Sequence, residues 1–401
     1  MRFPHLACTA PACAALIAAA LAAGSPPAGA APRTVDRATY LRLAEQGLAD
    51  VNRIWWNPVS KWYTAHPYRR TWGRGGLATL WDAVGVFEAT SLIAIADPRP
   101  ETLAAARRIA IGAERYWNRT EKGYNILPDM GARAWNLFFD DTGWWGLAFF
   151  EAYRATHDRR FLRDAARAYR FIVTAGWAAD DGGGVWWDTA HEKKTAEPLA
   201  AAALLGALLY ETTRDRTYLR GAQRLIAWAD AHSWNGARML YQRNEEQDTV
   251  MNYVEGMMVG AQAVLCRALH KASWCSRAEA LATTAIRAFP PSYHWAPETD
   301  AIYLRWMLAL WATDHNPKWY RVADHWGRMA VAHARDARGL FTRRWDGTFA
   351  SNDRLLTPSG TLMLLAALAA SPAPQPAQQP RPDEAGADPS RTIDAWTYRP
   401  S

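Results

Sequence analysis

The chain has 401 residues, of which 50% are hydrophobic, and a formal net charge of +7 at pH 7. Its basic residues are scattered through helix-like segments, which argues against a nucleic-acid partner but leaves attraction to an anionic cell surface or an acidic glycan open. The 22 tryptophans exceed what a core needs, and such a surplus is typical of sugar binding, because aromatic planes stack on the apolar faces of pyranose rings.

The first 30 residues predict a signal peptide. Arg2 precedes an apolar, alanine-rich run over residues 12–23, and Ala28-Gly29-Ala30 fits the small-x-small pattern of a cleavage site. The run is too short to cross a bilayer, and no other stretch of the sequence is long and uncharged enough to do so. We therefore expect a secreted protein, extracellular or periplasmic, without a membrane span.

Two kinds of helical segment alternate six times after the signal peptide. One kind is apolar nearly all round, which is typical of helices buried on most sides, and covers residues 79–96, 142–156, 198–212, 256–270, 301–313 and 359–370. The other kind is amphipathic and rich in arginine, which indicates one solvent-exposed face, and covers residues 37–54, 101–117, 159–176, 216–232, 277–288 and 318–335.

An internal repeat supports this alternation. Residues 153–177 and 210–234 align without gaps at an offset of 57 and share nine identities. Each copy contains the end of one helix, a short T-x-D-R turn and the start of the next helix. Self-similarity on this scale indicates a repeated supersecondary unit.

Six such helical hairpins predict an all-α fold, an (α/α)6 toroid or barrel, formed by a single domain over residues 34–370. The alternative is an open α-solenoid. Strand signals are scarce, apart from short runs at 185–188 and 239–243. We favour closure, because six units are present and neither end carries an obvious capping helix.

In a toroid, the connections that enter the inner helices meet at one end, which we call the rim. These connections carry acidic and aromatic residues at Trp81-Asp82, 140–145, 182–188, 194–197, 252–255, 298–300 and 352–353. The topology therefore predicts that acidic and aromatic side chains converge there.

Asp140 and Asp141 stand out within the rim, in the sequence FFDDTGWW at residues 138–145. One of them could serve as the N-cap of the next helix, where aspartate is preferred and negative charge is stabilising. A cap needs only one residue, whereas a second charge among aromatic side chains costs free energy. Paired carboxyl groups are what glycoside hydrolysis requires, about 5–5.5 Å apart in retaining enzymes.

Cys266 and Cys275 lie across the expected end of one helix and the start of the next. In an oxidising compartment a structural disulfide is the favoured interpretation, and two free buried thiols are the alternative. No cluster of cysteine and histidine has the spacing of a zinc site, so we predict neither a metal nor a cofactor. Residues 371–401 are rich in proline and alanine, with little to bury, and predict a disordered tail.

Four stretches resemble glycoside hydrolase family 76, the α-1,6-mannanases. The first is FFDDTGWWGLAFFEAYRATHD, where the family has an Asp-Asp pair followed by a tryptophan-rich helix. GGGVWWD at 182–188 is similar to the family's G-G-x-W-W loop. PLAAAALLGALLYETTRDRTYL, from residue 198, and NYVEGMMVGA, from residue 252, follow in the family's order.

The resemblance implies an (α/α)6 barrel and a retaining mechanism, in which Asp140 is the nucleophile and Asp141 the acid/base. The partner is then a polysaccharide similar to α-mannan, and we expect the protein to act as a monomer. The side chains predicted to contact the sugar at the rim are Trp81, Asp82, Trp144, Trp145, Trp186, Trp187, Tyr253 and Glu255.

The sequence departs from the family pattern at the predicted sugar-binding rim. Val254 and Glu255 replace an asparagine and a glutamine, and Glu197 stands where the family usually has a neutral polar residue. Two extra acids could select a basic or differently linked glycan. A cell-wall transglycosidase and a non-catalytic glycan-binding protein of the same fold remain alternatives. The Asp-Asp-x-x-Trp-Trp context argues against other (α/α)6 enzymes, such as uronyl hydrolases or sugar epimerases.

Overall fold

The computed structural model describes residues 35–68, 76–132, 135–290, 295–350 and 353–374. The predicted signal peptide and all but the first four residues of the predicted tail lie outside these ranges. Inside them the chain forms twelve α-helices, one short 3-10 helix at Glu114–Tyr116 and two small hairpins. None of the helices described is long and apolar enough to span a membrane.

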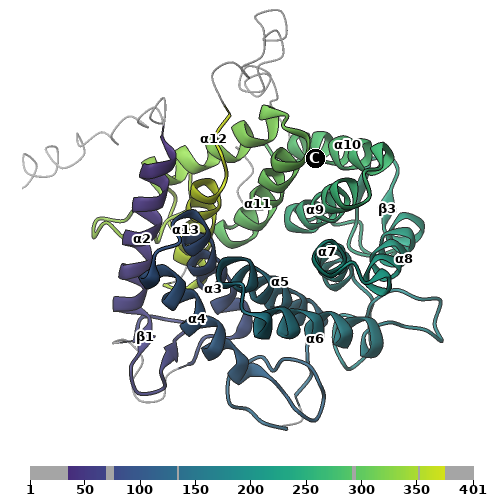
Figure 1. Cartoon of the computed structure of the whole chain (residues 1–401), viewed down its shortest axis with the longest axis horizontal. Helices are drawn as coiled ribbons and strands as arrows, with labels where there is room; N and C mark the ends of the chain where they lie inside the picture. The colour runs from purple at the N-terminus through teal and green to yellow at the C-terminus, as the bar shows by residue number, and fades with distance from the viewer. Residues whose placement is uncertain (1–34, 69–75, 133–134, 291–294, 351–352, 375–401) are drawn as a thin grey trace, which may run out of the picture. The chain divides into compact units, whose positions relative to one another are not determined.

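Two rings of helices lie one inside the other (Figure 1). The inner ring contains α3 (Leu80–Ala96), α5 (Phe139–Thr156), α7 (Ala196–Thr213), α9 (Asn252–Leu269), α11 (Pro297–Asp314) and α13 (Leu356–Ala370). The outer ring contains α2 (Arg37–Ile54), α4 (Pro100–Ala113), α6 (Arg159–Ala175), α8 (Arg216–His232), α10 (Ala272–Ala288) and α12 (Pro317–His333).

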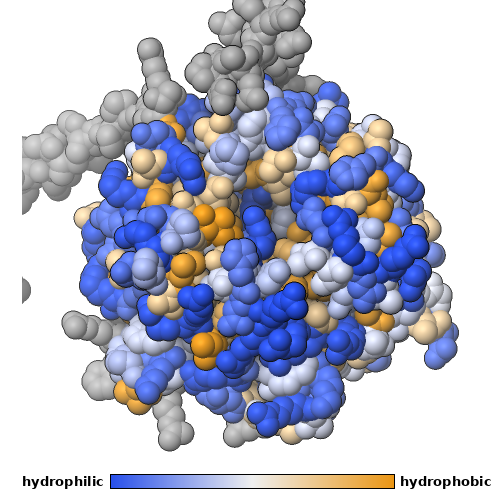
Figure 2. Space-filling model, viewed as in Figure 1, coloured by the Kyte–Doolittle hydropathy of each residue, from blue (hydrophilic) through white to orange (hydrophobic). Residues whose placement is uncertain are grey.

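The inner ring is closed. Each inner helix packs against the next, and the last, α13, packs extensively against the first, α3. This contact confirms the (α/α)6 toroid and excludes the open solenoid. The face of the molecule seen in Figure 2 is mostly hydrophilic, with apolar side chains towards the centre of the ring.

Five of the six inner helices, all except α3, begin earlier than the sequence predicts. Asp140 and Asp141, Glu197, Glu255 and Asp300 lie in the first turns of α5, α7, α9 and α11, rather than in the connections before them. Negative side chains are stabilised near a helix N-terminus, where unpaired N–H groups and the helix dipole favour them. The rim is therefore built partly from rigid helix ends.

The repeated T-x-D-R turn links α5 to α6 and α7 to α8, at the end opposite the rim. His157 and Arg214 end their helices in the left-handed conformation, and Asp158 and Asp215 then cap the next helices. The Thr156 hydroxyl donates to the Ala152 carbonyl and accepts from the Asp158 amide. These bonds satisfy helix ends that would otherwise lack partners, which explains why the turn recurs.

Short antiparallel hairpins cover the rim. β1 (Trp56–Asn57) pairs with β2 (Trp62–Tyr63), with Trp56 opposite Tyr63. β3 (Trp234–Asn235) pairs with β4 (Leu240–Tyr241), with Trp234 opposite Tyr241. In each hairpin the tryptophan and tyrosine rings meet edge to face, with centroids 5.1 Å apart. The two hairpins are therefore equivalent parts of the repeated unit.

A buried ionic network crosses the interior of the ring. Arg305, on α11, binds Glu88 on α3 and Glu151 on α5, the latter at 2.5 Å from Nη2 to Oε1. All three side chains are at most 7% exposed. Arg154 also binds Glu151, but from a half-exposed position. Three helices far apart in sequence are thus joined by one guanidinium group.

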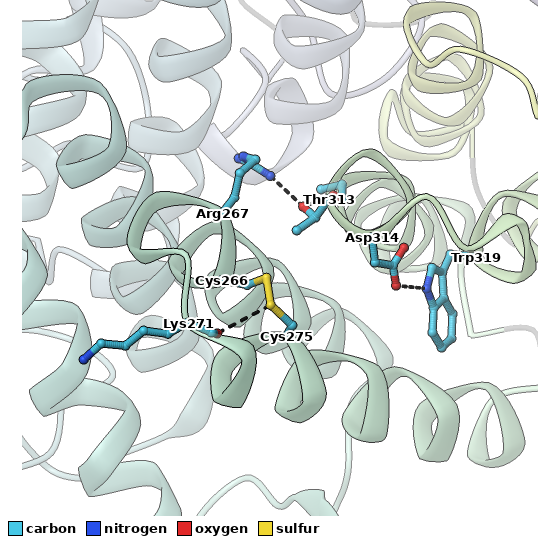
Figure 3. Close-up of a disulfide and its surroundings, with 8 residues drawn as sticks. Cys266, Arg267, Lys271, Cys275, Thr313, Asp314 and Trp319 are labelled. Carbon is cyan, nitrogen blue, oxygen red and sulfur yellow. Dashed lines mark hydrogen bonds between the residues drawn. A yellow bond between two sulfur atoms is a disulfide. The ribbon is translucent and has the colours of Figure 1, made fainter.

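Cys266 and Cys275 form a disulfide between the last turn of α9 and the first turn of α10, with Cα atoms 4.9 Å apart (Figure 3). Beside it, Arg267 donates to the Thr313 hydroxyl at 2.8 Å and so fixes the end of α9 against α11. The disulfide closes a short loop at the end opposite the rim.

We expect Cys266→Ala/Cys275→Ala to lower the free energy of unfolding by about 2–3 kcal/mol, because the unfolded chain regains the entropy of a loop of this length. Chemical denaturation of both forms measures the difference. Turnover should be unchanged, since the disulfide lies at the opposite end from the two aspartates. Equal stability of the two proteins would contradict this prediction.

Candidate active site

Asp140 and Asp141 are the second and third residues of α5. The helix N-cap is Phe138, which makes no side-chain capping bond, so neither aspartate is the cap. Phe139 is fully buried and anchors the first turn. The Phe139 amide donates to the Trp187 carbonyl at 2.9 Å, which brings the 182–188 loop over this turn.

The two carboxyl groups have different partners. One oxygen of Asp140 accepts from the Asp141 amide at 2.9 Å, and the other accepts from Trp187 Nε1 at 3.0 Å. In the described part of the chain, no hydrogen bond to the Asp141 carboxyl group is found. Hydrogen bonds to both oxygens favour the ionised form of Asp140, and Asp141 lacks such help.

Both aspartates have raised pKa values. Desolvation is the main cause of the rise in the pKa of Asp140 to about 7; the charge of Glu197 adds to it and the Trp187 hydrogen bond opposes it. Desolvation also raises the pKa of Asp141 well above its usual range, and the charges of Asp140 and Asp82 raise it further. Asp140 is therefore the more readily ionised of the two, because hydrogen bonds offset part of its desolvation, whereas nothing offsets the rise in the pKa of Asp141.

A row of aromatic rings runs across the rim beside the pair. Trp81 lies 5.6 Å from Trp144 between ring centroids, Trp144 lies 5.9 Å from Tyr253, and Tyr253 lies 5.7 Å from Trp295. Trp81, Tyr253 and Trp295 are partly exposed, whereas Trp144 is buried behind them. The row joins the starts of α3, α5, α9 and α11 and presents apolar ring faces at the rim.

Comparison with known proteins bears on what this site does. The model of the family described as "Glycosyl hydrolase family 76" matches residues 48–303. The chain belongs to glycosyl hydrolase family 76. The match covers both aspartates, the whole aromatic row and most of the helix ring, so the predicted family is confirmed. No curated protein matches the chain.

Solved structures share the family 76 fold. A family 76 glycoside hydrolase from a bovine Bacteroides thetaiotaomicron strain is 18% identical, with a TM-score of 0.74 over 84% of this chain and 79% of its own. An inactive variant of the α-1,6-mannanase from Salegentibacter sp., with two consecutive aspartates replaced, was solved with α-1,6-mannotriose; it is 17% identical, with a TM-score of 0.68 over 82% and 99%. The Dfg5 protein from Chaetomium thermophilum, in complex with glucosamine, is 14% identical, with a TM-score of 0.64 over 90% and 98%.

Four of the eight predicted sugar-contacting residues of this family 76 chain are buried, namely Asp82, Trp144, Trp145 and Glu255. Trp145 is fully buried in the core, where its Nε1 donates to the Ala113 carbonyl at 3.1 Å. Glu255 is also fully buried and accepts from the Tyr241 amide at 2.8 Å, which fixes the β3–β4 hairpin on α9. In this structure neither side chain is placed to touch a sugar, because helix packing turns both inward.

Asp82 lies next to the site, where it stabilises the start of α3. Its side chain completes a capping box with Thr79 at the start of α3 and also binds Arg354, from the segment before α13. Asp82 is fully buried, so it is not placed to contact a ligand. Its negative charge nevertheless raises the pKa of Asp141. This capping box holds the Trp81 end of the aromatic row in place.

Trp186 and Trp187 are both partly exposed but differ in role. Trp187 bonds to Asp140, and the Lys193 ammonium group lies 3.9 Å from the centre of its ring. Trp186 instead stacks on His191, with ring centroids 5.5 Å apart. Of the pair, Trp187 is therefore the one placed to orient a carboxylate.

Two features of the site were missed from the sequence. Arg243 forms an ion pair with Glu197, 2.9 Å from Nε to Oε1, while the other oxygen of Glu197 is buried without a hydrogen-bond partner. Trp295 extends the aromatic row. Its place in the connection before a predicted inner helix was a usable signal for Trp295, whereas nothing in the sequence pairs Arg243 with Glu197. Among the described residues, no group of three or more acidic, histidine or cysteine side chains is arranged to hold a metal ion.

Proposed function

We propose that this family 76 protein is a secreted, retaining glycoside hydrolase that cleaves α-1,6-mannosidic linkages in a mannan or a related cell-surface glycan. The observation that carries the proposal is the unequal aspartate pair at the start of α5. Two hydrogen bonds make Asp140 the more readily ionised carboxyl group, and Asp141 is held towards its protonated form. A retaining glycosidase needs this difference between its two carboxyl groups.

In the first step, Asp140 attacks the anomeric carbon while Asp141 gives its proton to the departing glycosidic oxygen, and a glycosyl-enzyme forms. In the second step, Asp141, now ionised, accepts a proton from a water molecule that displaces Asp140 from the sugar. Trp187 keeps the Asp140 carboxylate oriented through the first step. Trp81, Tyr253 and Trp295 supply the faces on which neighbouring sugars stack.

The choice of α-1,6-mannan is supported by the Salegentibacter relative, which was solved with α-1,6-mannotriose. At 17% identity this likeness supports the fold, so the linkage itself is part of the proposal. Secretion is supported by the pattern of residues 1–30, and we propose a monomer because the twelve described helices already complete the ring.

Transglycosylation is the second candidate. The aromatic row beside the aspartates favours a sugar acceptor over water in the second step, because stacked rings displace solvent from the site. Product sizes from α-1,6-mannan, measured with and without an added mannooligosaccharide acceptor, separate the two functions. A hydrolase gives only shorter chains, and a transferase also extends the acceptor. Failure to cleave α-1,6-mannan in either assay would contradict the proposed substrate.

Trp187→Phe and Glu197→Gln should shift the acid side of the activity profile in opposite directions. Activity rises with pH as Asp140 loses its proton. The Trp187 hydrogen bond lowers the pKa of Asp140 and the Glu197 charge raises it. Trp187→Phe should therefore move the acid limb of kcat/KM to higher pH, and Glu197→Gln to lower pH. If the acid limbs of the two variants shift in the same direction, or neither shifts, the ionisation of Asp140 does not govern the acid limb of kcat/KM.

A further inference from the structure

A cavity of about 350 Å³ opens in the outer wall of the toroid, between α8 and α10 and beside the β3–β4 hairpin. Its volume lies at the lower end of the range of roughly 300–1,000 Å³ that is typical of ligand pockets. Trp234 and Met239 from the hairpin flank it, and Asp230, Gln262 and Arg277 form a polar floor. The cavity shares no lining residue with the aspartate site.

The polar floor is held by its own hydrogen bonds. One guanidinium nitrogen of Arg277 donates to both carboxylate oxygens of Asp230, at 2.8 and 2.9 Å. Arg277 Nε donates to the Gln262 side-chain oxygen at 3.1 Å, and the Tyr241 hydroxyl donates to Asp230 at 2.7 Å. Asp230 and Arg277 balance each other's charge, so the floor is preorganised, polar and neutral.

The cavity mouth is apolar and exposed. Trp234 is 39% and Met239 is 52% exposed, and they are two of the six large hydrophobic side chains that are exposed in the described part of the chain. Exposed apolar surface that gathers beside a cavity marks a binding site more often than isolated side chains do. The indole N–H of Trp234 makes no hydrogen bond within the described residues and remains available to a ligand.

We propose that this cavity is a second glycan-binding site, which takes a neutral pyranose ring of a polysaccharide chain. A pyranose has an apolar face for the Trp234 ring and hydroxyl groups for Asp230 and Arg277, which are both partly exposed. A wholly apolar ligand would remove water from this ion pair without replacing its hydrogen bonds. A charged ligand would compete with one member of the pair for the other.

The site would hold a polysaccharide on the enzyme while the aspartates act elsewhere on the same chain. Two weak sites that engage one polymer raise its apparent affinity, because the second contact becomes intramolecular. The identity of the sugar rests on the proposed function, since mannan is the polymer that the aspartates are expected to cleave. The ability of the cavity to take a pyranose ring depends only on the residues that line it.

The test is electrophoresis through native gels that contain a neutral polysaccharide, with α-1,6-mannan, a glucan and a galactan in separate gels. All forms carry Asp140→Asn, so that the polymer stays intact. Trp234→Ala removes the stacking face. Trp56→Ala is the matched control, because Trp56 holds the equivalent place in the β1–β2 hairpin and does not line this cavity. Ala280→Met, at an exposed position that lines the cavity, fills the site without removing a buried contact.

We expect Trp234→Ala and Ala280→Met each to weaken retardation by α-1,6-mannan about tenfold, in line with the loss of one well-buried apolar contact. Trp56→Ala should behave like its parent. In the active background, Trp234→Ala should leave kcat/KM on an aryl mannoside unchanged. Equal retardation of Trp234→Ala and Trp56→Ala would overturn the inference, as would a loss of aryl mannoside turnover with Trp234→Ala.

The outcomes also separate this inference from the proposed function. If a glucan or galactan retards the protein instead, and Trp234→Ala abolishes that effect, the second site stands and the mannan assignment fails. If none of the three neutral polysaccharides retards the protein, the second site is refuted. The proposed hydrolysis is then judged separately, by product analysis.

Discussion

Asp140→Asn and Asp141→Asn should each reduce turnover of α-1,6-mannan by roughly 10⁴-fold or more, in line with the loss of an essential catalytic group elsewhere. An amide at position 140 cannot form the glycosyl-enzyme, and an amide at position 141 has no proton to deliver to the leaving oxygen. Turnover of purified variants, with circular dichroism to verify folding, measures the effect. Asn136→Ala, an exposed change at the same rim, is the control for local disturbance.

The two variants should differ in kind. On a mannoside with a good aryl leaving group, Asp141→Asn should keep part of the first step, since such a leaving group needs little protonation. Added azide should then partly restore its turnover, because azide attacks the glycosyl-enzyme without needing a base. Asp140→Asn should fail on both substrates. Near-normal activity of both variants on every mannan would disprove the proposed chemistry, and reversed behaviour would exchange the two roles.

Loss of activity in Asp140→Asn should come with a gain in stability at neutral pH. The folded-state pKa of Asp140 is raised to about 7, so the folded protein binds this proton more tightly than the unfolded chain does. The stabilisation that protonated Asp140 gives the folded state is therefore fully present below the pKa of the unfolded chain, near 4, and is lost as the pH rises through 7. The stability difference between variant and parent should accordingly grow from pH 4 to pH 7. A difference that does not change with pH would contradict the raised pKa.

Arg305→Met should lower the free energy of unfolding by about 3–5 kcal/mol, because it leaves Glu88 and Glu151 buried with no cation between them. Chemical denaturation at pH 7 measures the loss. Arg154→Met is the matched control, since Arg154 binds the same Glu151 from a half-exposed position, and it should cost about 1 kcal/mol or less. Similar losses in the two variants would show that burial of Arg305 contributes little.

The loss in Arg305→Met should shrink as the pH falls. Burial raises the pKa of Glu88 to about 7 even with Arg305 present, and removal of the cation takes away the interaction that opposes this rise. A buried carboxyl group of raised pKa favours folding below its unfolded pKa and opposes it above, so protonation at pH 5 should recover part of the stability. The same loss at pH 5 and pH 7 would refute this account of the network.

The sequence by itself determined the helix ring. Helices apolar on all sides alternate with amphipathic ones, and the Thr156–Asp158 turn recurs 57 residues later, because each unit must bury the same face and cap the same helix ends. It also placed Asp140 and Asp141 together at the rim, since they are neighbours in the chain and start an inner helix. These features depend on local patterns, which one chain segment carries on its own.

Only the tertiary structure decided which rim residues face a ligand and which charges meet. Trp144 and Trp145 are adjacent, yet one joins the aromatic row and the other fills the core, because successive positions on a helix point about 100° apart. Arg305 meets Glu88 across 217 residues of chain, and Trp187 reaches Asp140 across 47. Such contacts arise when the ring closes and brings distant helices together, and no local pattern in the sequence records that closure.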